Sequence, residues 1–281
     1  MTSQELYALL EIPEAVRVQF EAWDRERKMV VDDALYDRVL HRDTWSDAVK
    51  EWRVRLGEDP DGIAILWEML KKALVSFEEY RKRGIGQDIF QATMRFSTRY
   101  LNDALKQTGR YQFIAPWWFP RELSLVEFRV GTLEYEFFEE NGNRMIQIHI
   151  PSDADLSPVS LDASLEAFEN FRKTFFPEWM TAPRVCNSWM MSPALPQLLP
   201  PTSRILGFQR RFTLRNWDRE TNGVLNWVFP GHKEISEALP ENTSLQRSMK
   251  AYLLRGEPVG WAEAVMNEDM GRGTDGEDRS C

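Results

Sequence analysis

The 281-residue chain contains little cysteine, with only Cys186 and the C-terminal Cys281. A disulfide framework needs several paired cysteines, so it is excluded as the basis of the fold, and a reducing compartment, the cytoplasm, is predicted. The three histidines are widely separated in the sequence. They and the cysteines lack the spacing of a metal site, so no metal is predicted.

Long apolar runs are also missing. No segment approaches the roughly 18 residues of a membrane-spanning helix, and the first residues do not resemble a signal peptide, so neither a membrane span nor secretion is predicted. The net charge is −9, and no concentrated basic face indicates nucleic-acid binding. An acidic chain of this kind favours a cationic partner, such as an amine or a basic peptide.

Glycine-rich phosphate-binding motifs are absent as well. The chain has no P-loop, and Gly131 and Gly142 fit turns rather than a dinucleotide fingerprint. Aromatic residues, in contrast, are plentiful, with 11 Trp and 16 Phe. They predict thick hydrophobic cores or a cleft with aromatic walls.

Residues 1–115 predict a helical domain. Apolar residues from Ile63 to Tyr80 recur at helical spacing. The turn at residues 59–62 precedes this helix, and Gly84 follows it at the position where glycine commonly ends a helix.

Residues 116–266 predict a domain of mixed strands and helices. Strands are predicted at residues 125–130, 132–138, 145–150, 185–191, 206–214 and 224–229. A helix is predicted to begin after Ser157, a short segment covers residues 193–199, and a late helix covers 244–254. The fold class is therefore α/β (α+β), with a helical domain followed by a mixed sheet flanked by helices. The polar, glycine-containing tail, residues 267–281, is predicted to be disordered.

Several motifs occur in one order along the chain. They are Phe128-Arg129-Val130-Gly131-Thr132-Leu133-Glu134-Tyr135, the segment 146–157 (IQIHIPSDADLS), Cys186-Asn187-Ser188-Trp189-Met190-Met191-Ser192-Pro193, and Leu198-Leu199-Pro200. Together they resemble a bacterial acyltransferase family that combines an N-acyltransferase N-terminal domain with a GNAT-like C-terminal domain.

The resemblance implies a GNAT-like sheet, an acyl thioester donor and an amine acceptor. Some relatives acylate ribosomally made peptides, which implies a peptide acceptor and lipopeptide biosynthesis. Two departures from the pattern leave the donor open. Ser192 stands where relatives often have Asp, and the loop after His149 lacks the glycine-rich cradle for coenzyme A. Both acyl-CoA and an acyl-phosphopantetheine on an acyl carrier protein remain candidate donors.

Donor-binding residues are predicted at and after the loop that follows His149. The backbone N–H groups near a helix N-terminus can bind an anion. The predicted donor-binding set is Ile150, Ser152, Asp153, Ala154, Leu156, Ser157, Trp189, Gln209 and Arg211. The alternatives are that an aspartate of this loop caps the next helix, that Trp189 packs in the core, and that Gln209 and Arg211 lie on a solvated strand face.

His149 is the first candidate for proton transfer. Strand alternation places Gln147 and His149 on the face opposite Ile146 and Ile148, and imidazole titrates near neutrality. Tyr135 and Ser188 are candidates for protonating the leaving thiolate, and Cys186 is a candidate covalent acyl carrier. The competing interpretations are a structural hydrogen bond for His149 or Ser188 and a small buried hydrophobe for Cys186.

Three functions fit these patterns: an N-acyltransferase, a non-catalytic GNAT-like binding or scaffold module, and a thioesterase or cysteine acyl carrier acting through Cys186. The sequence leaves acyl length, acceptor identity and oligomeric state undetermined.

Overall fold

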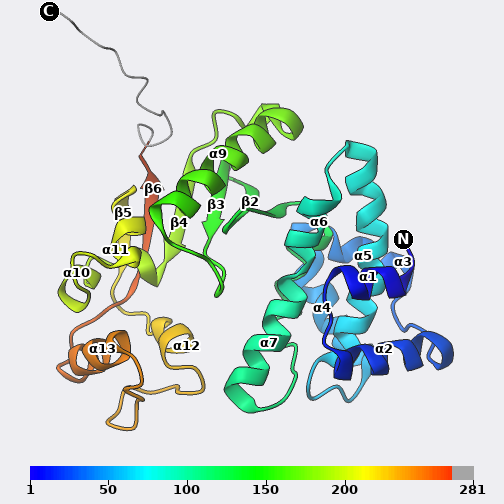
Figure 1. The fold of residues 1–281 in the computed structure, drawn as a ribbon, viewed down its shortest axis with the longest axis horizontal. Helices are drawn as coiled ribbons and strands as arrows, with labels where there is room; N and C mark the ends of the chain where they lie inside the picture. The colour runs from blue at the N-terminus through cyan, green and yellow to red at the C-terminus, as the bar shows by residue number, and fades with distance from the viewer. Residues whose placement is uncertain (268–281) are drawn as a thin grey trace, which may run out of the picture. The chain divides into compact units, whose positions relative to one another are not determined.

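The computed structural model describes residues 1–267, and the chain divides into two compact units (Figure 1). The first contains residues 1–130 and 134–136, and the second contains residues 131–133 and the chain from residue 137 onward. Across the described range, none of the helices is both long enough and apolar enough to span a membrane.

The first unit is built from helices, as predicted, with one short strand and part of another. Its elements are α1 (Ser3–Leu9), α2 (Glu14–Glu26), α3 (Asp33–Val39), α4 (Arg42–Leu56), α5 (Ile63–Arg83), α6 (Gln87–Met94), α7 (Phe96–Thr108), α8 (Pro120–Leu123) and β1 (Glu127–Val130). The predicted turn caps α5, because the Asp59 carboxylate accepts hydrogen bonds from the backbone N–H groups of Ala64 and Ile65 at 3.0 and 2.9 Å. A side chain at Gly62 would meet the Phe113 carbonyl oxygen, so this position requires glycine.

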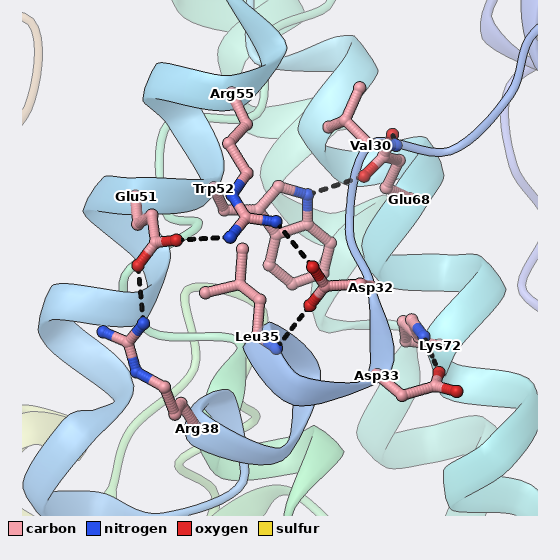
Figure 2. Close-up of polar contacts among 10 residues, drawn as sticks. All are labelled: Val30, Asp32, Asp33, Leu35, Arg38, Glu51, Trp52, Arg55, Glu68 and Lys72. Carbon is pink, nitrogen blue, oxygen red and sulfur yellow. Dashed lines mark hydrogen bonds and ion pairs between the residues drawn. The ribbon is translucent and has the colours of Figure 1, made fainter.

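Figure 2 shows how charged and indole groups join the helices of the first unit. The buried Glu68 carboxylate of α5 accepts hydrogen bonds from the Trp52 indole at 2.8 Å and the Val30 backbone at 2.7 Å. Nearer the surface, Glu51 pairs with both Arg38 and Arg55 at 2.5 and 2.6 Å. Removing the buried Trp52 indole would leave a desolvated carboxylate oxygen on Glu68, so the Trp52–Glu68 bond matters more than the exposed pairs.

The second unit contains most of the sheet and the later helices. Its elements are most of β2 (Leu133–Glu140), then β3 (Asn143–His149), α9 (Pro158–Phe175), β4 (Arg184–Ser188), α10 (Leu195–Leu198), α11 (Arg204–Gln209), β5 (Phe212–Asp218), α12 (Val224–Val228), α13 (Ser244–Leu254) and β6 (Trp261–Met266), with 3₁₀ turns η1 (Pro177–Trp179) and η2 (Trp189–Met191). The strands form one mixed six-stranded sheet in the order β1-β2-β3-β4-β6-β5. The predicted mixed sheet flanked by helices is therefore confirmed.

The first three strands and two helices of this region match their predictions. The hairpin between β2 and β3 turns at Asn141 and Gly142, both with positive φ (52° and 77°), as an Asn-Gly hairpin requires. Ser157 caps α9 by accepting a hydrogen bond from the Ser160 backbone at 3.3 Å. The late helix α13 begins and ends at the predicted residues, with a capping box formed by Thr243 and Gln246.

Two strand predictions are right only in part, and a third is wrong. The segment predicted as a strand at 185–191 ends at Ser188, and η2 follows it. The segment 206–214 divides between α11 and β5, and the segment 224–229 contains the helix α12, because Val224, Leu225 and Val228 bury one helical face. The prediction missed β6, whose buried positions are mostly alanine and so give a weak alternating signal. The tail predicted as disordered lies outside the described residues, apart from Asn267.

The two faces of the sheet differ in what covers them. Helix α9 lies across β3 and β4 in Figure 1, and its Glu169 pairs with Arg184 of β4 at 2.9 Å. The α9 face therefore carries Arg184 and, by alternation, Cys186 and Ser188 of β4. The parallel register pairs Ile146 with Arg184, so Ile146 and Ile148 of β3 also belong to the α9 face. The opposite face carries the alternate residues, which are Gln147 and His149 of β3 and Val185 and Asn187 of β4.

Candidate functional site

The strands β3 and β4 pair only over a short stretch. Their parallel register joins Ile146 to Arg184 and Gln147 to Val185, and it goes no further although β3 continues to His149 and β4 to Ser188. At the start of the paired stretch, the Ile146 backbone N–H donates a hydrogen bond to the Pro183 carbonyl at 3.0 Å. The pairing of the two strands therefore ends before their carboxyl ends, where β3 and β4 separate.

His149 is the last residue of β3 and lies at this separation. It is half-buried and, by alternation, shares the opposite face with Gln147 and Val185. The isoleucines on the α9 face, Ile146 and Ile148, are buried, as the sequence predicted. The strand thus presents an imidazole on the face that α9 does not cover.

The other two candidates on β4 lie on the α9 face. Cys186 is fully buried, and burial raises the pKa of its thiol. A thiol that resists ionisation is a poor nucleophile, so the environment favours the interpretation of Cys186 as a small buried hydrophobe. The Ser188 hydroxyl accepts a hydrogen bond from the Met190 backbone at 3.1 Å and so caps η2. His149 and this pair therefore occupy different faces of the sheet.

The loop from Ile150 to Ser157 leads directly into α9. Asp155 accepts hydrogen bonds from the Ser160 hydroxyl at 2.7 Å and from the Ser157 backbone and hydroxyl at 3.0 and 2.9 Å, and it pairs with Arg204 at 3.0 Å. These bonds, that from Ser160 foremost, lower the pKa of Asp155 to about 2. Asp155 therefore forms an Asx turn that holds the N-cap residue Ser157, and Arg204 compensates part of the negative charge beside the N-terminus of α9.

The remaining predicted donor contacts do not form one strand face. Trp189 lies in η2 rather than in a strand, and it packs against the buried cluster that includes Leu195. Gln209 ends α11 and donates a hydrogen bond to the Ser192 carbonyl at 2.7 Å. Arg211 is buried and pairs with Asp162 of α9 at 2.6 Å. The prediction that Gln209 and Arg211 share a strand face is wrong, because the chain changes from helix to strand between them.

Tyr135 is a buried residue of β2, in the part of the strand that belongs to the first unit. Around the same stretch, the first unit buries four glutamates: Glu122, Glu127, Glu134 and Glu136. Glu134 pairs with Arg99 at 2.7 Å, and Glu136 pairs with Arg42 and with Arg121. Sequence reasoning missed this glutamate cluster, although acidic residues alternating within the apolar segment 127–137 were its visible signal.

Glu122 is the least compensated member of the glutamate cluster. It is 1% exposed, and neither carboxylate oxygen accepts a hydrogen bond from another described residue. Burial, and then the charge of Glu134, raises the pKa of Glu122 well above its usual range, and the pKa of Glu127 is raised for similar reasons. Folding therefore favours the protonated carboxyl.

Replacing Glu122 with glutamine should stabilise the chain at pH 8 by about 1–3 kcal/mol and give little gain at pH 5. The unfolded carboxyl ionises above about pH 4.3, so the folded protein loses stability as pH rises from there toward the raised pKa, and glutamine removes that loss. Thermal unfolding of both proteins at the two pH values measures the difference. Glu58→Gln, at an exposed position of the same unit, is the matched control, and an E122Q gain independent of pH would contradict the assignment.

Comparisons with known proteins give two matching family models. A model of an N-acyltransferase N-terminal domain matches residues 1–125, and a model of a GNAT-like C-terminal domain matches residues 77–266. No match was found among curated proteins.

Solved structures share the fold at low sequence identity. An acyltransferase mutant in complex with octanoyl-CoA is 21% identical, with a TM-score of 0.77 over 94% of this chain and 87% of that one. An acyltransferase in complex with decanoyl-CoA and teicoplanin is 19% identical, with a TM-score of 0.68 over 95% of this chain and 99% of that one. A third, with CoA and 10C-teicoplanin, is 18% identical at the same TM-score and coverage.

Proposed function

We propose an N-acyltransferase function for this chain, which belongs to the family that joins an N-acyltransferase N-terminal domain to a GNAT-like C-terminal domain. The reaction is transfer of an acyl group from the thioester of acyl-CoA to the nitrogen of an amine. The donor is proposed as acyl-CoA because the similar structures are complexes with octanoyl-CoA, decanoyl-CoA and CoA.

The observation that carries the proposal is the separation of β3 and β4 beyond the Gln147–Val185 pair. An extended pantetheine arm carries amide groups, and these can pair with the strand backbone at the separated ends of β3 and β4. The phosphates then extend toward the loop 150–157 and the N-terminus of α9, where backbone N–H groups and the nearby Arg204 favour an anion. In this proposal the phosphates reach the loop residues Ser152, Ala154 and Ser157 by displacing bonds present without donor, since the N–H groups of Ala154 and Ser157 donate to the Pro151 carbonyl and the Asp155 carboxylate, each at 3.0 Å.

His149 accepts the proton of the attacking amine. The neutral nitrogen forms a bond to the thioester carbonyl carbon, and a tetrahedral intermediate with an oxyanion results. As the intermediate collapses, the carbon–sulfur bond breaks and the coenzyme thiolate leaves, taking up the proton that His149 accepted from the amine. The products are an amide and free coenzyme A. Alignment of the two reactants at the strand separation supplies the main lowering of the barrier.

An acceptor that carries a peptide fits the proposal, because teicoplanin is bound in two of the similar structures. The test is intact-mass analysis of candidate peptide amines incubated with the full chain and octanoyl-CoA. Gain of one octanoyl unit on the amine, with release of free coenzyme A, supports the proposal. Turnover that occurs only with an acylated carrier protein would show that this protein, and not acyl-CoA, is the donor. Binding of octanoyl-CoA with no turnover on any amine would favour the binding-module alternative.

Replacing Cys186 with alanine should leave turnover essentially unchanged. The thiol is buried on the α9 face and its pKa is raised, so it is not available as an acyl carrier. The substitution removes one sulfur from a packed site and costs stability by about 1 kcal/mol. Initial rates and intact mass of the protein after incubation with octanoyl-CoA give the answer. An octanoyl adduct on the wild-type chain that is lost in C186A, together with lost activity, would establish the covalent route.

A further inference from the structure

A polar pocket opens over β4, β6 and β5 in the second unit, and it encloses about 300 Å³. This volume is at the lower end of the range of small-molecule sites. The lining residues are Asn187, Asn216, Asp218, Thr221, Trp261 and Glu263. None of them was singled out by the sequence as a site residue.

Strand register brings these side chains to one face. Glu263 of β6 lies opposite Asn187 on β4 and opposite Asn216 on β5, and Trp261 lies opposite Asp218. A β-bulge at Arg215 makes this possible. Without the extra residue, Arg215 would oppose Glu263 and bring a positive charge to the pocket. The bulge instead directs an amide and a carboxylate into it, which is a common use of bulges beside functional sites.

The pocket has the chemistry of an ammonium site. Two exposed carboxylates, on Asp218 and Glu263, line it, and no Lys or Arg among residues 1–267 does. Within residues 1–267, the carboxylate of Glu263 and the indole N–H of Trp261 make no hydrogen bond, while Asp218 accepts one from the Glu220 backbone at 3.0 Å. Carboxylates and an indole face attract an ammonium ion, and the neighbouring amides can bind its hydrogen-bonding substituents.

The pocket lies on the same face of the sheet as His149. The β3–β4 register puts Gln147 beside Val185, so His149 and Asn187, two residues further along each strand, share the face opposite α9. Paired neighbouring strands are about 4.8 Å apart, so Glu263, two strands from β3, lies at least about 10 Å from His149, and further where β3 and β4 separate. The pocket is therefore too distant to hold the reacting nitrogen itself.

We infer that this pocket binds a second ammonium group of the acceptor, about 10 Å or more from the nitrogen that is acylated. The inference rests on the proposed function, and it specifies the substrate class: a polycationic amine or a peptide with two amino groups. It also explains why the pocket excludes basic side chains. The two carboxylates orient the acceptor so that its other amino group reaches the imidazole.

Isothermal titration of the full chain with spermidine, in the absence of any acyl donor, tests the pocket directly. Glu263→Gln and Asp218→Asn should each weaken spermidine binding about tenfold or more, because each removes a charge-assisted contact. Glu166→Gln on α9 makes the same change of charge at an exposed position and should leave binding unchanged. No spermidine binding to the wild-type chain, or equal loss in all three variants, would overturn the inference.

A second measurement separates this inference from the proposed function. With octanoyl-CoA present, the D218N variant should raise the KM for spermidine and leave the Kd of octanoyl-CoA unchanged. Carboxylate-dependent binding without any acyl transfer would retain the pocket and refute the proposed function. If the wild-type chain acylates spermidine, and D218N and E263Q bind spermidine as tightly as the wild type, the proposed function stands and the inference about the pocket is refuted.

Discussion

Replacement of His149 with alanine should lower kcat by a factor of about 10²–10⁴, the usual contribution of a general base. His149 ends β3 beyond the last residue pair with β4, and by alternation its side chain is on the face opposite α9. Without it, the attacking amine must lose its proton to water.

Two controls keep this result specific to proton transfer. The Kd of octanoyl-CoA should be unchanged in H149A, because the proposed donor contacts come from backbone groups. His232→Ala makes the same chemical change in the turn after α12 and should retain the wild-type rate. Full turnover in H149A, with an unaltered pH profile, would remove His149 from the mechanism.

Replacement of Arg99 with alanine should destabilise the chain by about 3–5 kcal/mol, the largest loss of stability predicted here. The side chains of Arg99 and Glu134 are 8% and 6% exposed, and they pair at 2.7 Å. Loss of the guanidinium leaves the Glu134 carboxylate buried without its partner. The negative charge of Glu134 already raises the pKa of the nearby Glu122 and Glu127, so the three carboxyl groups repel one another when ionised. Denaturant unfolding of the wild-type chain and the variant measures the difference.

An exposed pair in the same unit provides the comparison. Arg95 pairs with Glu11 at 2.5 Å near the surface, so Arg95→Ala should cost far less than Arg99→Ala. The double variant Arg99→Ala with Glu134→Gln should recover much of the loss, since it removes both members of the buried pair. Equal losses in R95A and R99A would show that burial does not strengthen the Arg99 pair.

Where local signals agreed, the sequence predicted the fold well. The cap of α5 at Asp59, the Asn141-Gly142 hairpin and the capped start of α9 depend on residues close together in the chain. The errors arose where tertiary packing decided the conformation. The segment 224–229 is β-prone in composition, yet it forms a helix because its apolar residues face the cluster around Leu195 and Phe229.

The candidate site was less predictable than the fold. Strand alternation placed His149 and Gln147 correctly on a face opposite the buried isoleucines. The same alternation, extended through residues that leave the strand at Ser188, misplaced Trp189. The pocket around Glu263 could not be predicted, because it depends on a register shift at Arg215 and on β6, a strand the sequence did not reveal.

Hydrogen–deuterium exchange of the full chain with and without octanoyl-CoA tests the central claim most directly. The account places the pantetheine arm between the parted ends of β3 and β4. Octanoyl-CoA should therefore slow exchange at residues 147–150 and 185–188, and at the N-terminus of α9. If saturating octanoyl-CoA slows exchange elsewhere in the chain but not at these two strand ends, the result contradicts the account.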